Sequence, residues 1–308
     1  MMLIDEQRLD LVGEIGEIAA VTVSHVRSSD PQLPGDLAFK RPGPGLGADV
    51  QRRLLESMQD AVRARELIAA PDLAELDRHT TWPLAMVARD GRVVGCLSQL
   101  IPFDYYLQTR APDGQRRYRP FEWRLLSASA DQLGSVADVR AATDDELVLL
   151  TLMARLAYAV EVLHRPHSYL RLVYGDLNPR TIVVATSPPR ILLTGAEGVA
   201  DVNDITRNQA NSPFFLPPEI GDGQQKLQDQ LTDVYKLGLC IMRGLAVGRG
   251  ASQLTDPASP QVRPGLLDAA GVNLLRAAVG PDRDHRPTAE EIKDYLIGRV
   301  LDLAERRV

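Results

Sequence analysis

A short polar loop between an apolar helical segment and a β-branched segment constrains this chain more than any other stretch. Residues 146–164 have apolar side chains at the spacing of a buried helix, and residues 182–184 have the β-branched composition of a strand. The loop before this strand, residues 174–181, carries one carboxylate, Asp176. Because flanking regular elements hold such a loop in place, the pattern predicts a functional site rather than a surface turn.

The composition predicts a folded domain with a sizeable core. The chain has 308 residues, of which 44% are hydrophobic, enough for one large two-lobed domain or two ordinary ones. It carries 41 acidic and 35 basic side chains, a net charge of −6, without a basic block. We therefore expect no nucleic-acid partner.

The sequence favours a reducing compartment. Cys96 and Cys240 lie far apart within apolar runs, which indicates buried thiols rather than a disulfide. No apolar run reaches the roughly 18 to 20 residues that span a bilayer. The N-terminus contains Asp5, Glu6 and Asp10 and lacks the pattern of a signal peptide. We expect a cytoplasmic protein without a membrane segment.

The polar loop, extended to residues 172–184, resembles the catalytic loop of the protein-kinase-like superfamily. That pattern is His-Arg-Asp, four further residues, and then Asn, and bacterial members often have Gly-Asp in place of Arg-Asp. In this chain Tyr174 and Gly175 replace the His and Arg, and Asp176 keeps the position of the catalytic base. Thr181 stands where the metal-binding Asn belongs. The resemblance thus implies a catalytic loop in which a metal ligand is replaced.

Three downstream segments resemble the same family in the correct order. Residues 211–219 resemble the end of the activation segment, residues 231–242 the central helix of the large lobe, and residues 282–292 the Arg-Pro-Thr region. The resemblance implies that Asp233 binds backbone N–H groups of the catalytic loop. It also implies a buried ion pair between Glu219 and Arg286.

The resemblance implies an α+β, bilobal protein-kinase-like fold. The small lobe, residues 1–102, is antiparallel β with one helix at about residues 48–70. The large lobe, residues 103–308, is mainly helical. It contains an insertion at about residues 103–144 and an activation-like segment at residues 195–219.

Residues 9–26 alternate like a hairpin and can be aligned with the glycine-rich loop of kinases. With Gly16 as the first glycine, the second and third positions fall on Ile18 and Val21. A side chain at these positions obstructs the approach of the backbone to phosphates. The alternative is an ordinary hairpin with incidental glycines.

Lys40 follows a strand-like segment and resembles the kinase lysine that holds the nucleotide phosphates. Glu56, on the predicted helix, resembles the glutamate that pairs with this lysine. Glu66 is the second choice, and a solvated carboxylate is the remaining alternative. Gln99, Leu100 and Ile101 resemble the hinge whose backbone meets an adenine ring.

The resemblance implies that both protein ligands for Mg²⁺ are missing. The strand pair after the catalytic loop ends, in kinases, in Asp-Phe-Gly, whose aspartate binds the metal. Here Leu193, Thr194 or Gly195 takes that position, depending on the register. Mg²⁺ prefers hard oxygen ligands with at least one carboxylate. The replacement carboxylates considered are Glu197, Asp201 and Asp204.

The leading hypothesis is a pseudokinase that regulates or scaffolds another protein, with ATP bound weakly or not at all and without Mg²⁺. The alternative is an active, atypical ATP-dependent kinase of the Ser/Thr type, or another nucleotidyl or phosphoryl transferase, with Asp176 as base. An aminoglycoside-phosphotransferase-like enzyme fits less well, because that family lacks the downstream segments found here. Aromatic residues of the insertion, beside Arg116, Arg117 and Arg119, form either a partner surface or a packed flank.

Overall fold

The structure is a computed structural model that describes residues 1–18, 20–110, 115–126, 144–207, 209–223, 225–246 and 262–307. The chain forms two compact units. One, here called the β-unit, contains residues 1–101, 166–173 and 194–210. The other, the helical unit, contains residues 102–165, 174–193 and 211–308. We describe each unit by itself.

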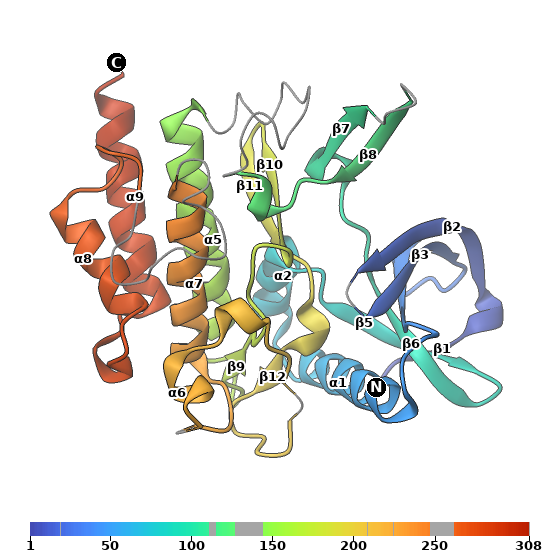
Figure 1. The fold of residues 1–308 in the computed structure, drawn as a ribbon. Coiled ribbons are helices and arrows are strands. Elements are labelled where there is room, and N and C mark those ends of the chain that lie inside the picture. The colour runs from blue at the N-terminus through green and yellow to red at the C-terminus, as the bar shows by residue number, and fades with distance from the viewer. Residues whose placement is uncertain are drawn as a thin grey trace. The chain divides into compact units, whose positions relative to one another are not determined.

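The β-unit is built on a six-stranded sheet with the order β1-β5-β6-β4-β3-β2 (Figure 1). Its strands are β1 (Leu3–Asp5), β2 (Leu9–Ile18), β3 (Val21–Ser28), β4 (Asp36–Pro42), β5 (Pro83–Arg89) and β6 (Arg92–Gln99). The pair β1–β5 is parallel and the other four pairs are antiparallel. A short pair, β9 (Leu172–Val173) with β12 (Ala200–Asp201), belongs to the same unit.

The tight turn between β5 and β6 follows from its two residues. Asp90 and Gly91 both have positive φ, 51° and 74°. Two central residues with positive φ are typical of the turn that matches the twist of a hairpin, and Asp-Gly is a favoured pair there. Asp-Gly between two apolar, strand-like runs is itself a sequence signal for a hairpin, and the structure forms one here, with Arg89 paired to Arg92.

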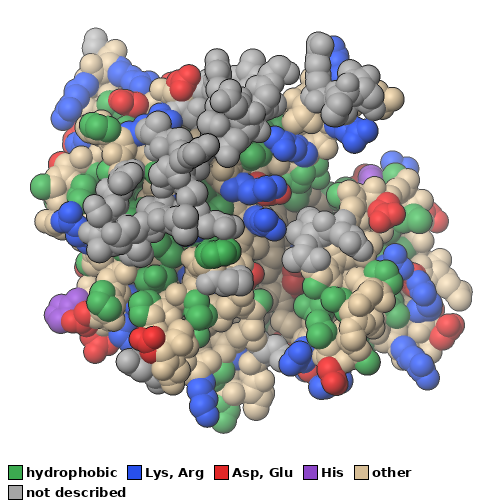
Figure 2. Space-filling view, in the orientation of Figure 1, with side chains coloured by type: hydrophobic (Ala, Val, Ile, Leu, Met, Phe, Trp, Pro, Cys, Tyr) green, Lys and Arg blue, Asp and Glu red, His purple; other side chains and the backbone are tan. Residues whose placement is uncertain are grey.

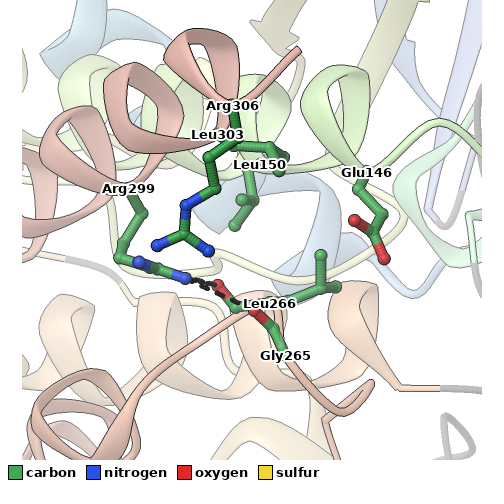
Figure 3. A pocket seen from close by; sticks show the side chains of 7 residues that line it. All are labelled: Glu146, Leu150, Gly265, Leu266, Arg299, Leu303 and Arg306. Carbon is green, nitrogen blue, oxygen red and sulfur yellow. Dashed lines mark hydrogen bonds between the residues drawn. The ribbon is translucent and has the colours of Figure 1, made fainter.

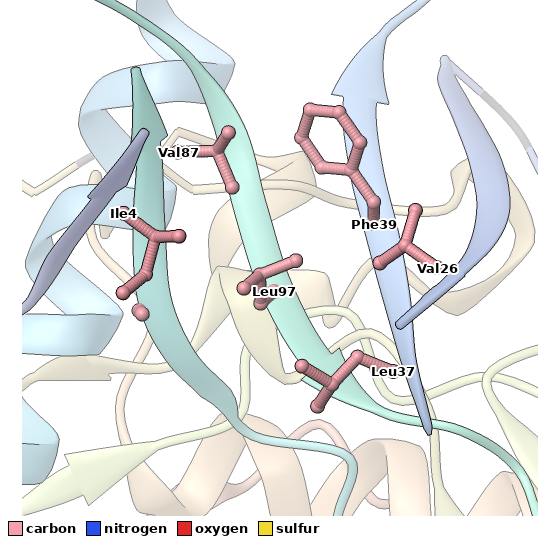
Figure 4. Packing of buried hydrophobic residues seen from close by; sticks show 7 residues of the cluster. Ile4, Val26, Leu37, Phe39, Val87 and Leu97 are labelled. Atoms are coloured by element: carbon pink, nitrogen blue, oxygen red, sulfur yellow. The ribbon is translucent and has the colours of Figure 1, made fainter. Parts of the chain in front are cut away.

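Hydrophobic side chains cover both faces of the sheet. One face holds a buried cluster of Ile4, Val26, Leu37, Phe39, Ala85, Val87 and Leu97 (Figure 4). A second cluster, which includes Ala38, Met86 and Cys96, packs against Met58 and Val62 of helix α1 (Ala48–Glu66). Because side chains alternate along a strand, Lys40 shares the α1 face of β4 with Ala38.

The helix predicted at about residues 48–70 is present as α1, which is shorter than predicted, and it is followed by a second helix that the sequence analysis did not predict. Helix α1 ends at Glu66, and α2 runs from Ala70 to His79. Pro71 lies in the first turn of α2, where its missing N–H costs no helical hydrogen bond. The predicted helix ended just before this proline, because proline inside a helix removes a backbone hydrogen bond, and α2 was therefore not predicted.

The helical unit is organised around α5 (Glu146–His164). This helix packs against α7 (Gln230–Leu245) and α9 (Ala289–Glu305), and α8 (Ala269–Ala278) contacts both α7 and α9 (Figure 1). The unit also contains the short helix α6 (Pro218–Gly221) and two hairpins, β7 (Tyr106–Arg110) with β8 (Arg116–Pro120) and β10 (Ile182–Thr186) with β11 (Pro189–Leu193). The last hairpin is the strand pair predicted after the catalytic-like loop.

Helix α5 corrects the expectation that no segment is long and apolar enough to span a bilayer. It meets that test by length and composition. However, 67% of its apolar window is buried inside the protein, as in the core helix of a globular domain. Arg155 and Glu161 interrupt its apolar run, but two charged residues do not take the helix below the hydropathy of a possible span.

The aromatic residues of the predicted insertion separate into two groups. Tyr105, Phe121 and Trp123 are buried, and the Trp123 indole donates to the Cys240 carbonyl at 2.8 Å. Tyr118 is 51% exposed. The described aromatic residues of this segment are therefore divided between the core of their unit and the solvent, and residues 111–114 and 127–143 lie outside the described residues.

Candidate functional site

Lys40 is a buried lysine held by a carboxylate of its own unit. Its backbone pairs with Val23 on one side and Cys96 on the other. The Nζ donates to Glu197 Oε2 at 2.8 Å, and the two side chains are 9% and 18% exposed. The Ser57 hydroxyl of α1 donates to the Glu197 carbonyl at 2.9 Å. Helix α1 therefore positions the backbone of the residue that neutralises Lys40.

Gly95 lets strand β6 approach Lys40 closely. A Cβ at position 95 would lie 2.2 Å from the Lys40 carbonyl oxygen, a distance that side chains do not tolerate. Only glycine therefore fits without moving the strand that carries the lysine.

The predicted ion pair between Lys40 and Glu56 is wrong. Glu56 accepts a hydrogen bond from Arg52 at 3.0 Å, one turn away on the same helix, and is 42% exposed. Glu66, the second choice, pairs with the N-terminal amino group. Helical spacing placed Glu56 correctly on α1, but it could not identify Glu197, which lies 157 positions from Lys40 in the chain.

The other nucleotide-site candidates of the β-unit lie on strands or at strand ends. Gly16 has φ of 137° and pairs with Val23 beside an irregularity in β2, so glycine meets a backbone need there. Gln99 ends β6 opposite Leu37, and Leu100 packs against the cluster that contains Cys96. Ile101 is the last residue of this part of the β-unit.

The loop that carries Asp176 belongs to the helical unit and is fastened by Asp233 of α7. This carboxylate is fully buried and accepts from the backbone N–H groups of Tyr174, at 2.6 Å, and Gly175, at 2.9 Å. His164 lies 3.1 Å from the same carboxylate. These are the loop contacts that the kinase resemblance implies for Asp233. Gly175 has φ of 83°, a conformation that disfavours a side chain such as the arginine it replaces.

The Asp176 side chain contacts the segment that precedes α6. Its Oδ1 accepts from the backbone N–H of Ser212 at 2.7 Å. Its carbonyl oxygen accepts from Asn178 Nδ2 at 2.9 Å and lies 3.1 Å from the Thr181 hydroxyl. The Thr181 hydroxyl also accepts from the Asn178 N–H at 3.1 Å, so this side chain closes the loop on itself.

Lys236 is a functional-site residue that the sequence reading missed. It lies on α7, is fully buried, and donates to the Gly175 carbonyl, to the Gln228 side chain and, at 2.7 Å, to Asn211 Oδ1. Burial lowers the pKa of Lys236, and the carboxylates of Asp233 and Asp176 partly offset this effect. The sequence feature that could have identified Lys236 is its place as a lysine within an otherwise apolar stretch, residues 234–242.

A second buried ion pair joins α6 to the segment before α9. Arg286 donates to the two carboxylate oxygens of Glu219 at 2.6 and 2.8 Å. Arg286 also bonds the carbonyls of Gly280 and Leu231, and its guanidinium lies 5.1 Å from the ring centroid of Tyr235. The arginine and glutamate side chains are 0% and 5% exposed. This is the pair that the resemblance implies.

The residues at the two expected metal-ligand positions do not fit Mg²⁺. Leu193 is buried and apolar, Gly195 has no side chain, and Thr194 and Thr181 offer neutral hydroxyls, the second of which is bonded within its loop. Among the described residues, no group of three His, Cys, Asp or Glu side chains could hold a metal ion. Neutral hydroxyls are weaker ligands for Mg²⁺ than a carboxylate.

Two cavities lie away from these residues. One of about 20 Å³ in the helical unit is lined by seven residues (Figure 3): Glu146, Leu150, Gly265, Leu266, Arg299, Leu303 and Arg306. This volume holds about one water molecule. The other, about 390 Å³, is an open groove of the β-unit whose lining includes Arg41, Gln51, Leu55 and Val93. Neither cavity is lined by Lys40 or Asp176.

The fold, a β-sheet lobe and a mainly helical lobe, is that of a protein kinase domain. Among solved structures, the kinase domain of Mycobacterium tuberculosis PknI is similar to this chain, with a TM-score of 0.60. The match covers 95% of this chain and 96% of that chain at 19% sequence identity. At this identity the likeness shows the fold alone. No protein-family model matches the sequence. A search of curated proteins also found no match.

Proposed function

We propose that this protein is a pseudokinase, a kinase-like domain that regulates or scaffolds another protein and binds nucleotide weakly or not at all. One observation carries the proposal. The lysine at the phosphate-binding position, Lys40, is neutralised by Glu197, a carboxylate of its own unit. In addition, the two expected metal-ligand positions offer no carboxylate.

The energetic argument concerns what a nucleotide would have to displace. A phosphate that binds Lys40 competes with Glu197 for the ammonium group. Displacement would leave a carboxylate, 18% exposed, without its partner and next to an incoming anion. A poorly solvated charge without its partner is costly, and like charges repel. We therefore expect Glu197 to oppose the binding of a polyphosphate.

The second candidate function is an active transferase with unusual metal handling, and Glu197 also favours it. Mg²⁺ in nucleotide sites is often held by one or two carboxylates together with the substrate phosphates. A single carboxylate beside Lys40 could serve in this way. Asp176, at the position of the base, is retained in a loop that Asp233 fastens. Activity would then be that of a protein kinase of the Ser/Thr type or another phosphoryl or nucleotidyl transferase.

Substitution of Glu197 separates the two candidate functions because they predict opposite changes in the affinity for ATP. We would measure ATP binding by calorimetry and by thermal shift, with and without Mg²⁺ or Mn²⁺, for the wild-type chain and Glu197→Gln. The pseudokinase predicts tighter ATP binding by the variant, with or without metal, because the competing charge is gone. The transferase predicts that the variant loses metal-dependent binding.

Matched controls make the outcome specific to this carboxylate. Glu56→Gln removes an exposed carboxylate of α1 and should leave ATP binding unchanged. Lys40→Met should weaken any ATP-induced shift, because ligand that binds only the folded form stabilises it by mass action. Phosphoryl transfer by the wild-type protein that is abolished in Asp176→Asn would overturn the pseudokinase proposal.

A further inference from the structure

Three aromatic rings form a contiguous face on one side of the hairpin β7–β8. Gln108 pairs with Tyr118, and Tyr106 pairs with Pro120, so alternation puts Tyr106 and Tyr118 on the same face. The Phe103 ring, just before the hairpin, lies 4.9 Å from that of Tyr118 and 6.3 Å from that of Tyr106, centroid to centroid. Arg116, two positions before Tyr118, projects from the same face. We call Phe103, Tyr106, Arg116 and Tyr118 the aromatic face.

The core of the helical unit does not account for this face. The hairpin is anchored through other residues, since Tyr105, Leu107 and Phe121 are each no more than 4% exposed. Phe103, in contrast, is 68% exposed and Tyr118 is 51% exposed. Large aromatic side chains that gather in solvent, apart from the core, mark interaction sites.

The charge of the hairpin indicates what chemistry the face accepts. Strand β8 carries three arginines in five residues and no acidic residue, within a chain whose net charge is −6. Arg116 is exposed on the aromatic face, whereas alternation places Arg117 and Arg119 on the opposite face of the hairpin. Asp104, the acidic residue beside Phe103, is paired with Arg190. Figure 2 shows blue Lys and Arg side chains at this hairpin, in the upper right of the view. The strand is therefore locally basic on an acidic protein.

We propose that the aromatic face docks an acidic segment of a partner protein that also carries apolar or aromatic side chains. Carboxylates form paired hydrogen bonds with guanidinium groups, and aromatic rings offer a rigid apolar surface. A nucleic acid fits less well, because the protein is acidic overall and a single short basic strand can contact only a few phosphates of a nucleic-acid backbone. The proposal deepens the proposed scaffolding function, on which it rests, by naming the chemistry of the partner.

The test uses a defined probe and the full chain. A fluorescein-labelled peptide of about twelve residues with the repeat Glu-Leu-Asp-Phe supplies the acidic and apolar groups of a typical docking segment. The same peptide with Gln and Asn for Glu and Asp removes only the charge. A single-stranded oligonucleotide of similar length supplies charge and bases. Binding is followed by fluorescence anisotropy at low and high salt.

The expected result is saturable binding of the acidic peptide that weakens as salt is raised. Arg116→Glu and Tyr118→Ser should each reduce the affinity by at least about tenfold. Phe103→Ser is a second aromatic variant, in case Tyr118→Ser alters the hairpin, and circular dichroism checks the fold of each. The matched controls are Arg276→Glu, an exposed arginine of α8, and Tyr169→Ser, a tyrosine that is 67% exposed. Both should bind like the wild type.

Four outcomes would overturn this inference. They are no binding of the acidic peptide at about millimolar concentration, equal binding of the neutral peptide, equal loss in the two control variants, and binding of the oligonucleotide alone. None of them bears on the proposed function, which depends on Glu197 and Asp176. Conversely, phosphoryl transfer by the wild-type chain would remove the pseudokinase proposal while leaving peptide docking intact.

Discussion

Lys40 in the β-unit and Arg286 in the helical unit each form an ion pair with a glutamate, and the two pairs are built differently. Arg286 binds both oxygens of Glu219, adds bonds to two backbone carbonyls, and is fully buried. Lys40 makes a single contact to Glu197, and both side chains keep some exposure to solvent. The first pair has the geometry of a structural link. In the Lys40–Glu197 pair, another anion could displace Glu197 and bind the lysine.

This difference indicates that the two ion pairs have different roles in the molecule. In the helical unit, Asp233, Glu219 and Arg286 make the contacts that hold a kinase-like loop and helix together. In the β-unit, Lys40 is neutralised by Glu197, which follows β11 in the chain. The contacts that hold the helical unit together and the charges around Lys40 therefore come from different residues.

The largest effect is expected for Arg286→Ala. It leaves the Glu219 carboxylate buried and unpaired, which costs about 3–5 kcal/mol of unfolding free energy. Urea denaturation followed by circular dichroism would measure this. A loss below about 1 kcal/mol would show that Glu219 is solvated or finds another partner, and the contrast between the two pairs would then disappear.

A smaller effect is expected for Glu197→Ala in the absence of nucleotide. Lys40 loses its carboxylate partner but can reach solvent more easily than Arg286, so we expect a loss of about 1–2 kcal/mol. The pseudokinase proposal further predicts that ATP restores more stability to this variant than to the wild type. Thermal denaturation with and without ATP measures both quantities. If ATP stabilises the two proteins equally, Glu197 does not compete with phosphate for Lys40.

Alkaline pH tests one thiol in each unit. Burial raises the pKa of Cys96 in β6 and of Cys240 in α7 from 9.0 to about 12. In the unfolded chain the thiols ionise near pH 9, while in the folded chain they stay protonated, so the stability they contribute is complete below pH 9 and falls between pH 9 and 12. Each thiol should cost about 1 kcal/mol per pH unit in this window.

Urea denaturation at pH 8 and pH 10 would measure the effect of the thiols. Cys240→Ala should reduce the loss of unfolding free energy between the two pH values, and Cys96→Ala should reduce it as well. If neither variant changes the slope of stability against pH, the thiols are ionised or solvent-accessible in the folded protein. The comparison would then rest on the ion pairs alone.

The smallest effect is expected for Arg52→Ala, which breaks the exposed pair with Glu56 on α1. An exposed pair one turn apart contributes about 0.3–0.5 kcal/mol, and added salt screens it. The measurement is the same denaturation experiment at low and high salt. A loss as large as that of Glu197→Ala would mean that Glu56 has a role in the site that its position on the helix surface does not suggest.

The sequence predicted those features whose causes are local or whose motifs are ordered along the chain. The Asp90-Gly91 hairpin follows from turn chemistry, and the apolar segment 146–164 forms α5. The strand pair after the loop follows from two apolar runs separated by a turn. The α+β, kinase-like fold was likewise predicted from the order of the downstream segments, and the similarity in structure to a solved kinase domain supports it.

The candidate site was predicted only in part. Lys40 and Asp176 were proposed as site residues from the segments that carry them, but the partner of Lys40 was assigned to Glu56 from the distance along the chain that the kinase resemblance implies. Helix α2 was not predicted, because the predicted helix ended just before Pro71. Lys236 was overlooked because a lysine in a helix normally faces water.

By itself, the sequence determined several of the elements and their order, because turn chemistry, side-chain periodicity and residue type are local properties of the chain. The tertiary structure alone decided which charges meet. Glu197 reaches Lys40, Lys236 bonds Gly175 and Asn211, and Asp176 accepts from Ser212. These partners lie far apart in sequence, and only the packing of strands and helices brings them within hydrogen-bonding distance.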